Sequence, residues 1–395
     1  MKDGPHNLLD YTVKKGRKMD WNFVFDAYPV NRNLIWLNNC GITPAGTHIV
    51  QAISNFLKGY TERGILTQTA SYPGTKRRIK EILAGLLGCR PNELALIHNT
   101  AEGMNFISQG LSLMPTDEII LLENEYPSNV YPWRHWEKKG VKICSTPMET
   151  SPSAFTQSLR QMITDKTRVI SLSAVHWCTG MPLPIDQIGA LCRERGIDFV
   201  VDGAQGVGTQ RIDVKKANID YMAFPAWKWL MGPLGLGVLY VPENKLDSLQ
   251  PAFVGPDSVV QSESYLPYKS KLKPSADRFS FSTASINDLV HFQAALEFLE
   301  SIGFEKIRKR LIKLSEHLVK GLQQIGFHVL ADEFHVPLSG IVVGENPRIS
   351  SDLIFSHLKK NDIIAAKRLG RIRFSPHIYI SYEQIDKVIR TLSRI

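Results

Sequence analysis

The 395-residue sequence has no stretch of 18 or more uncharged apolar residues, so we expect no membrane-spanning helix and no membrane partner. Its basic N-terminus, MKDGPHNLLDYTVKKGRKMDW, lacks an apolar core and a small-residue cleavage site, so no secretory signal is predicted. Apolar residues make up 43% of the chain and charged residues 22%, as is usual for a globular protein. The length predicts one large domain and one smaller domain.

Cysteine is scarce and scattered. The five cysteines are odd in number and form no C-x-x-C pair: Cys40, Cys89, Cys144, Cys178 and Cys192. This pattern disfavours a disulfide framework and a structural zinc site, and we expect no metal. A reducing cytoplasm is the compartment that fits it best.

Several common functional signatures are also missing. The chain has no nucleotide P-loop, no H-E-x-x-H zinc pattern and no G-x-S-x-G nucleophile elbow. The close glycines of Gly232–Gly237 precede a predicted strand, whereas a dinucleotide fingerprint follows one. The net charge is +9, and the densest basic run, Phe304–Leu322, has Ile and Leu at helical spacing. It predicts the solvated face of an amphipathic helix, and we expect no nucleic-acid partner.

Short apolar runs alternate with helical stretches through the middle of the chain. This alternation predicts an α/β fold with a mostly parallel central sheet. The expected strands are residues 93–99, 118–124, 141–146, 168–175, 198–204 and 237–241, with helices such as 74–88 and 184–196 between them. Ligands bind at the carboxyl ends of such strands, so the residues after each strand are the candidates for chemistry.

The segment 254–285 is rich in Ser, Pro and Lys and predicts an irregular crossing. Amphipathic helices and two expected strands, 339–344 and 371–380, follow it and indicate a smaller α+β domain. We predict three parts: an N-terminal segment (1–44) that joins the small domain, a large domain (45–265) and a small C-terminal domain (266–395).

Three strand ends carry candidate residues of modest specificity. TAEGMN, after strand 93–99, opens a helix whose free N–H groups would bind an anion; a plain cap with Thr100 and Glu102 is the alternative. Tyr126 would either stack on a flat cofactor or pack in the core. His176 follows strand 168–175, where a lone histidine is more often structural than catalytic.

Two charged residues are predicted in apolar surroundings. Asp202 ends the apolar strand DFVVD, where a buried carboxylate needs a positive partner; a turn-forming aspartate is the alternative. Lys228 stands between Trp227 and Trp229, and desolvation would lower the pKa of its amine and make it nucleophilic toward an aldehyde. Alternatively, its aliphatic stem lies under the tryptophans and its ammonium reaches water. Together with the anion site and the stacking aromatic, these residues match pyridoxal phosphate (PLP).

The motifs occur in the order TAEGMN, EYPSNVYPW, VHWCTGMPLPI, VVDGAQGVG, AWKWLMGPLGLGVLYV and RIRFSPHIY. In this order, over roughly residues 30–395, the chain resembles the class V aminotransferase family of fold type I PLP enzymes. The most similar branch holds cysteine desulfurases, selenocysteine lyase and isopenicillin N epimerase-like proteins. The resemblance implies PLP as cofactor, an amino-acid substrate and a homodimer with shared active sites.

The resemblance also implies residue roles around the cofactor ring. Lys228 would form the Schiff base and carry the Cα proton. Asp202 would pair with the ring nitrogen, Gln205 would bond the ring hydroxyl and Tyr126 would stack on the ring.

At the phosphate, the resemblance implies contacts from Thr100, Ala101 and Glu102, largely through the helix N-terminus. Ser282 and Thr283 match a Gly-Thr step that reaches the partner subunit's phosphate. Relatives carry Ser-Gly-His before the lysine and use the Ser and His for phosphate, but this chain has Pro225, Ala226 and Trp227 there. Two phosphate donors are therefore missing.

At the substrate, Arg373 matches the arginine that clamps the carboxylate, and His176 is a second candidate contact. The run 359–377 lacks the cysteine that carries persulfide in desulfurases. We therefore expect an enzyme for transamination or Cβ elimination on a small or sulfur-containing amino acid, and disfavour a persulfide-forming desulfurase. Epimerisation, with Tyr126 or His176 as second acid, and a binding protein without turnover are the alternatives.

Overall fold

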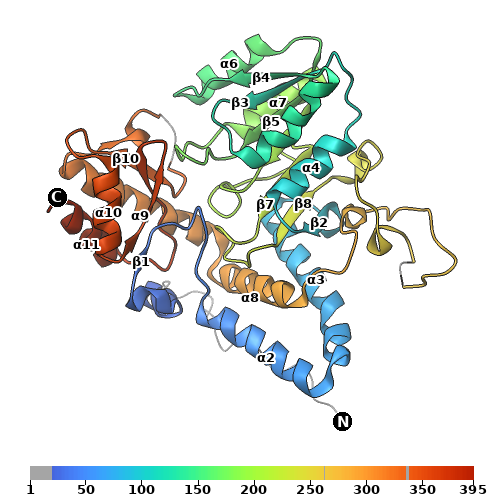
Figure 1. The fold of residues 1–395 in the computed structure, drawn as a ribbon, viewed down its shortest axis with the longest axis horizontal. Helices are drawn as coiled ribbons and strands as arrows, with labels where there is room; N and C mark the ends of the chain where they lie inside the picture. The colour runs from blue at the N-terminus through green and yellow to red at the C-terminus, as the bar shows by residue number, and fades with distance from the viewer. Residues whose placement is uncertain (1–19, 262, 335–337) are drawn as a thin grey trace.

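The computed structural model describes residues 20–261, 263–334 and 338–395 (Figure 1). Its large sheet has seven strands in the order β2-β8-β7-β6-β5-β3-β4. All neighbours are parallel except β8, which runs antiparallel to β2 and β7. The predicted α/β fold with a mostly parallel sheet is confirmed. The strands are β2 (Leu94–Ile97), β3 (Glu118–Leu122), β4 (Lys142–Thr146), β5 (Thr167–Ser173), β6 (Asp198–Asp202), β7 (Tyr221–Pro225) and β8 (Gly237–Tyr240).

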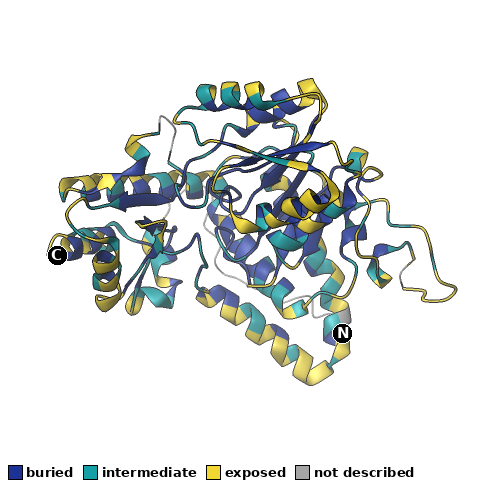
Figure 2. Cartoon of the chain, turned by 45° about the horizontal axis from the view of Figure 1, so that its top comes forward, coloured by how far each residue is buried: buried dark blue, intermediate teal, exposed yellow. Residues whose placement is uncertain are grey.

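Helices cover both faces of this sheet, which is why its strands, apart from the edge strand β4, are mostly buried (Figure 2). Alternate residues of one strand enter different cores: Ile119 and Leu121 lie in one, Ile120 and Leu122 in the other. The helices of this part are α2 (Thr47–Arg63), α3 (Ile65–Leu87), α4 (Thr100–Gly110), α5 (Tyr131–Arg134), α6 (Pro152–Met162), α7 (Ile185–Arg195) and α8 (Ile286–Ile302). Among the described residues, no helix combines the length and apolar character needed to cross a lipid bilayer.

Two strand predictions need correction. Strand β7 was not predicted, although its five residues are all buried, because the apolar run YMAFP continues directly into the segment around Lys228. The expected strand 371–380 is wrong beyond Phe374, where β13 (Arg371–Phe374) ends. Pro376 has no N–H to donate to a ladder, so the chain leaves the sheet there.

The C-terminal part forms a second, antiparallel sheet in the order β12-β13-β10-β9. Its basic helix, α9, buries the Ile and Leu stripe predicted from the sequence and turns its lysines outward. The elements are α9 (Phe304–Gln324), β9 (His328–Val329), β10 (Val342–Glu345), α10 (Ser351–Lys360), β12 (Ala366–Arg368), β13 and α11 (Tyr382–Leu392).

The N-terminal segment lies beside this small domain. After α1 (Trp21–Asp26), strand β1 (Ile35–Trp36) pairs in parallel with β11 (Ile363–Ile364). Residues 1–19 of the predicted N-terminal segment lie outside the described residues. The pairing brings residues 37–43 to the carboxyl edge of the large sheet, where they meet the segment around Lys228: Thr43 N–H donates to Trp227 O at 3.0 Å. The domain boundaries themselves stay a prediction.

In the segment 254–285, the described residues form only short 3-10 turns, η6 (Pro256–Ser258) and η7 (Ala276–Phe279), and one isolated bridge between Val259 and Leu272. It projects at the right of Figure 1, and Ser280 ties its end to β2 by donating to Leu96 O at 2.9 Å. The irregular crossing is therefore confirmed for its described residues. The remaining 3-10 turns are η1 (Pro29–Arg32), η2 (Pro91–Glu93), η3 (Pro127–Asn129), η4 (His135–Lys139), η5 (Glu243–Lys245) and η8 (Leu330–Asp332).

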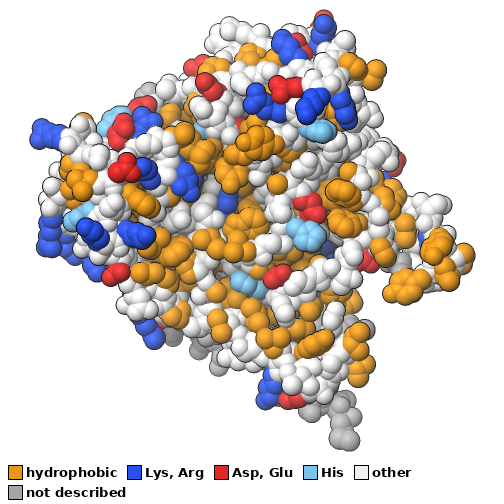
Figure 3. Space-filling view, viewed as in Figure 1, with side chains coloured by type: hydrophobic (Ala, Val, Ile, Leu, Met, Phe, Trp, Pro, Cys, Tyr) orange, Lys and Arg blue, Asp and Glu red, His pale blue; other side chains and the backbone are white. Residues whose placement is uncertain are grey.

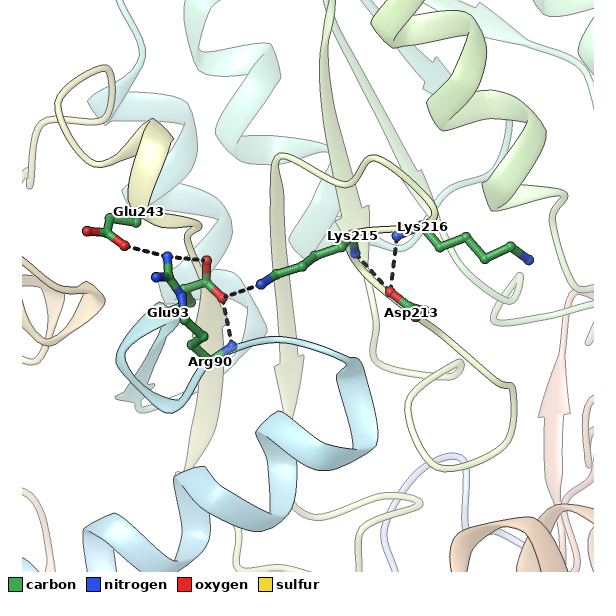
Figure 4. A network of polar contacts seen from close by, with 6 residues as sticks. All are labelled: Arg90, Glu93, Asp213, Lys215, Lys216 and Glu243. Atoms are coloured by element: carbon green, nitrogen blue, oxygen red, sulfur yellow. Dashed lines mark hydrogen bonds and ion pairs between the residues drawn. The ribbon is translucent and has the colours of Figure 1, made fainter.

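At the amino edge of the large sheet, charged residues pair with one another (Figure 4). A cavity of about 630 Å³ lies here, but its buried carboxylate, Glu93, is held by Arg90 N–H at 2.7 Å and Lys215 Nζ at 3.5 Å. Burial would raise the pKa of Glu93, but the hydrogen bonds from Arg90 and the charge of Lys215 outweigh it and lower the pKa. Arg90 Nη2 pairs with both Glu93 and Glu243. We therefore assign these charged pairs a structural role and do not treat this cavity as a ligand site.

Candidate active site

A cavity of about 340 Å³ opens at the carboxyl edge of the large sheet, where strands β2, β3, β5, β6 and β7 end. This is the edge at which parallel sheets bind ligands. Segments from the N-terminal part and the small domain close it. Its walls contain Cys40, Gly41, Asn99, Thr100, Ala101, Tyr126, Ser128, Trp177, Asp202, Ala204, Gln205, Pro225, Trp227, Lys228, Arg368 and Arg373.

The start of helix α4 forms one end of the cavity. Asn99 caps the helix by accepting from Glu102 N–H at 2.9 Å, and Thr100 and Ala101 line the cavity. Gly103 lets the helix sit directly on the sheet, because a Cβ there would lie 2.6 Å from the Cβ of Ala223. The helix N-terminus, with its partial positive charge, therefore faces the cavity.

Asp202 is the last residue of β6 and is buried. Burial raises the pKa of its carboxyl to about 7; the nearby Glu125 charge also raises it, and Lys228 lowers it. Among the described residues its carboxylate accepts one hydrogen bond, from Ala204 N–H at 2.8 Å. A buried carboxylate that lines a cavity with so few donors favours a cationic ligand group.

Lys228 follows β7 in a segment whose backbone is firmly held. Thr43 Oγ1 donates to Lys228 O at 2.7 Å, and Gly232 N–H donates to Ala226 O at 2.8 Å. Burial lowers the pKa of Lys228, against the raising effect of the Asp202 and Cys40 charges. Its Nζ lies 5.4 Å from the ring centroid of Tyr126, which stands over the cavity in edge contact with Trp177.

Arg373 reaches the cavity from β13 of the small domain. It is buried, and its Nη1 donates to Trp177 O at 2.6 Å. Within the described part of the chain, its Nε is buried without a hydrogen-bond partner. A guanidinium with unused donors in a ligand cavity is suited to a carboxylate. Arg368, on β12, is a second arginine in the same wall.

Three predicted site residues do not line this cavity. The Glu102 carboxylate turns back to His98, accepting from its N–H at 2.5 Å. The His176 ring lies between Asn124 O at 3.1 Å and Thr179 Oγ1 at 2.9 Å, and burial lowers its pKa to about 4. Thr283, with Ser282, lies exposed on the surface.

The cavity also contains residues that sequence reasoning did not single out, most notably Cys40 and Arg368. Cys40 stands about 190 positions before Lys228 and reaches it only through the pairing of β1 with β11. No local motif signals that contact. Pro225 and Trp227 line the cavity with Thr100 and Ala101, so the Ser and His side chains expected from the family are replaced by a side chain with no donor and by an indole with one N–H.

Residues 35–391 match the aminotransferase class-V family. The chain belongs to this family. A probable cysteine desulfurase of Pyrococcus abyssi is 26% identical over 388 residues, which are 93% of this chain and 95% of that protein. The family match and this relative confirm the resemblance that the sequence motifs indicated.

Solved structures share the fold. C-DES, named a cystine C–S lyase, matches with a TM-score of 0.86 at 24% identity, over 95% of this chain and 99% of C-DES in a form with glycine covalently linked to its PLP cofactor. The apo cysteine desulfurase of Thermococcus onnurineus NA1 matches with a TM-score of 0.84 at 23% identity, over 96% of this chain and 98% of the other.

This family member is a PLP-dependent enzyme, and family membership leaves its reaction type open. The residues present fit the cofactor. Asp202 offers a buried carboxylate, the start of α4 offers an anion site and Lys228 offers an amine with a lowered pKa, all in one cavity.

Proposed function

We propose that this enzyme cleaves the Cβ–S bond of a small sulfur-containing amino acid by elimination. The observation that carries this proposal is that Lys228 and Arg373 face one cavity, while the β12–β13 hairpin beside them holds no cysteine. A base near Cα and a clamp for the carboxylate support chemistry at Cα and Cβ. The absence of a hairpin thiol, and the likeness to a cystine C–S lyase, favour elimination over transfer to that hairpin.

PLP, when bound, withdraws electrons from the bonds at the substrate Cα. Lys228 is the residue that would hold the cofactor aldehyde and then take the Cα proton. The lowered pKa of its amine supplies the neutral, nucleophilic form that both tasks need. Asp202 would keep the ring nitrogen protonated, and Tyr126 would cover one ring face.

The phosphate would bind at the start of α4, through the N–H groups and hydroxyl of Thr100 and the backbone of Ala101. Pro225 and Trp227 stand beside it in place of the Ser and His of the family pattern, so this chain would bind the phosphate less tightly than relatives that carry those two residues. Ser282 and Thr283 would add contacts to the phosphate of the partner subunit, which their surface exposure permits.

Arg373 would clamp the substrate carboxylate bidentately with the donors that Trp177 O leaves free. With Cα deprotonated, the Cβ–S bond breaks and its electron pair leaves with sulfur. One water is consumed, and pyruvate, ammonium and the thiol or persulfide are released. Arg368 lies in the same wall and would attract a second carboxylate on a longer substrate such as cystine.

A homodimer with shared sites is part of this proposal. Figure 3 shows hydrophobic side chains gathered over the middle of one face, and large apolar residues are exposed along α2, α3 and the segment 253–268. Exposed apolar area of this extent is typical of an interface. The five unpaired cysteines are in keeping with a reducing cytoplasm.

One observation favours a second candidate, a persulfide-forming desulfurase that uses Cys40. Cys40 lines the same cavity as Lys228 and Arg373. In this reaction the thiolate form of Cys40 would attack the substrate sulfur and form an S–S bond. The Cβ–S bond would break, its electron pair would stay with Cβ, and protonation of Cβ would give alanine. The relatives named cysteine desulfurase support this candidate.

A product assay separates the candidates. PLP-loaded enzyme is incubated with L-cysteine and L-cystine, and pyruvate, ammonium, alanine, keto acid and released sulfur are quantified. Pyruvate and ammonium in equal amounts support elimination, and alanine with a 32-Da mass increase on the Cys40 peptide supports the second candidate. Cys40→Ser should leave elimination intact and abolish the mass increase. A keto acid that retains the substrate side chain would instead indicate transamination.

A further inference from the structure

Trp229, the residue after Lys228, is buried and points its indole at Gln205. Its Nε1–H donates to Gln205 Oε1 at 2.8 Å, and Gln205 Nε2 donates to Cys40 O at 3.0 Å. An indole N–H can only donate, so it fixes which end of the Gln205 amide is oxygen. The NH₂ group has two hydrogens, and Cys40 O uses one of them. The remaining N–H belongs to a residue that lines the cavity.

The indole is itself held rigidly in place. His377 is fully buried; its Nδ1 accepts from Ile378 N–H at 2.8 Å, so its Nε2 carries the proton and donates to Trp229 O at 3.2 Å. Two glycines with positive φ leave room for Trp229: a Cβ on Gly208 would lie 3.1 Å from its Cβ, and one on Gly340 would lie 3.2 Å from Cη2. Trp229 is therefore held by three separate parts of the chain: residues 205–208, 340 and 377–378.

We propose that Trp229 is a positioning residue that orients the Gln205 amide so that it offers a donor, and never an acceptor, to the ring oxygen of bound PLP. This inference rests on the proposed function and on the role that the family resemblance implies for Gln205, a hydrogen bond to that oxygen. A hydrogen-bond donor next to the ring oxygen stabilises the negative charge on that oxygen. The oxygen then stabilises less strongly the proton on the adjacent nitrogen that joins Lys228 to the cofactor.

The consequence is measurable without turnover. With Trp229 in place, the nitrogen that joins Lys228 to PLP loses its proton at a lower pH. Without the indole, the amide can turn and present its oxygen, and the proton is held to a higher pH. The visible absorbance of the bound cofactor reports this proton, so its pH midpoint is the direct readout.

The experiment compares Trp229→Phe, Gln205→Leu and the double variant with the unaltered protein. Trp136→Phe is the matched control, because Trp136 is also buried and donates from its indole, to Ser108 O at 3.1 Å, away from the cavity. We expect Trp229→Phe to raise the absorbance midpoint by about 0.5 to 1 pH unit, the size of one hydrogen bond. Trp136→Phe should leave the midpoint unchanged. In the Gln205→Leu background, Trp229→Phe should add no further shift, because its effect passes through Gln205.

Gln205→Glu is a second route that leaves Trp229 intact. It replaces the donor with an oxygen and should raise the midpoint in the same direction, which keeps the test decisive if Trp229→Phe fails to fold. An unshifted midpoint in PLP-loaded Trp229→Phe, or an equal shift with and without Gln205, would overturn the inference. A protein that never binds PLP would instead refute the proposed function itself.

Discussion

The carboxyl groups of Asp202 and Glu125 are both buried, which raises the pKa of each, and the charge of Glu125 raises the pKa of Asp202 further. Glu125 is held by Ser173 N–H at 2.8 Å and Tyr126 N–H at 2.8 Å, beneath the aromatic that stands over the cavity. Burial is the main reason that the pKa of Asp202 rises to about 7, and Glu125 adds to it. The site therefore contains a costly negative charge that a protonated ring nitrogen would stabilise.

This cost predicts a stability–function trade-off at Asp202. The pKa of Asp202 in the folded state is about 7, above its ordinary 3.8. Between about pH 4 and 7 the folded protein binds more protons than the unfolded chain, so stability falls as the pH rises through this window. Asp202→Asn should remove this loss of stability at higher pH and raise the melting temperature of PLP-free protein at pH 8. It should also weaken PLP binding and lower activity. Thermal melts from pH 4 to 8 test this; an equal slope in both proteins would contradict it.

Lys228→Ala should remove the covalent hold on PLP. We expect the visible absorbance of the bound cofactor to be lost and turnover to fall by at least about 1,000-fold, since both the anchor and the proton carrier are missing. Lys216→Ala is the control, because Lys216 is an exposed lysine paired with Asp186 far from the cavity. Retained turnover in Lys228→Ala would refute the assignment.

Arg373→Ala should raise KM for every carboxylate substrate by roughly 10- to 100-fold, as expected for a lost charged hydrogen-bond pair. Arg371→Ala, two residues earlier on the same strand and paired with Glu345, should change KM little. Steady-state kinetics with L-cystine and with an amine that lacks the carboxylate separate loss of the carboxylate contact from a general effect of removing an arginine. An unchanged KM in Arg373→Ala would contradict the clamp.

The shared site predicts complementation between two defective proteins. Thr283→Asp places a negative charge beside the partner subunit's phosphate and should weaken PLP binding there. In a mixed dimer of Lys228→Ala and Thr283→Asp chains, one site keeps both native residues. Refolding the two proteins together should therefore restore activity, up to half of the sites in each mixed dimer. Light scattering that shows only monomers, or a mixture with no gain in activity, would contradict the shared site.

Two glycines give a matched test of how helix α4 is placed. Gly103→Ala puts a Cβ 2.6 Å from that of Ala223, so we expect a loss of about 1–3 kcal/mol in unfolding free energy and weaker PLP binding as the helix start shifts. Gly85→Ala in α3 meets nothing within 4 Å and should stabilise the protein by up to about 1 kcal/mol. Denaturant unfolding and PLP titration measure both; equal effects would contradict the close seating of α4.

Much of this architecture could be predicted because local chemistry determines it. A short apolar run such as FVV in DFVVD indicates a buried strand. The residues that end such strands meet at one edge of a parallel sheet, which brings Asp202, Tyr126 and Lys228 together. The strand YMAFP was missed because its apolar pattern merges with the tryptophans around Lys228. Sequence spacing gave no boundary there.

The rest of the candidate site depends on long-range contacts that no local sequence pattern encodes. Cys40 reaches the cavity because β1 pairs with β11, and Arg368 because β12 and β13 form a hairpin beside it. His176 stands at a strand end like the other candidates, but its ring bonds Asn124 O and Thr179 instead of facing the cavity. Side-chain direction at a strand end is set by tertiary packing, which the sequence alone does not reveal.

The product balance with L-cystine tests the central claim most directly. PLP-loaded enzyme should release one pyruvate and one ammonium for each Cβ–S bond cleaved, together with a persulfide, and Lys228→Ala should release none. PLP-loaded enzyme that yields no pyruvate from L-cystine or L-cysteine, or that yields only a keto acid with the side chain intact, would contradict the account.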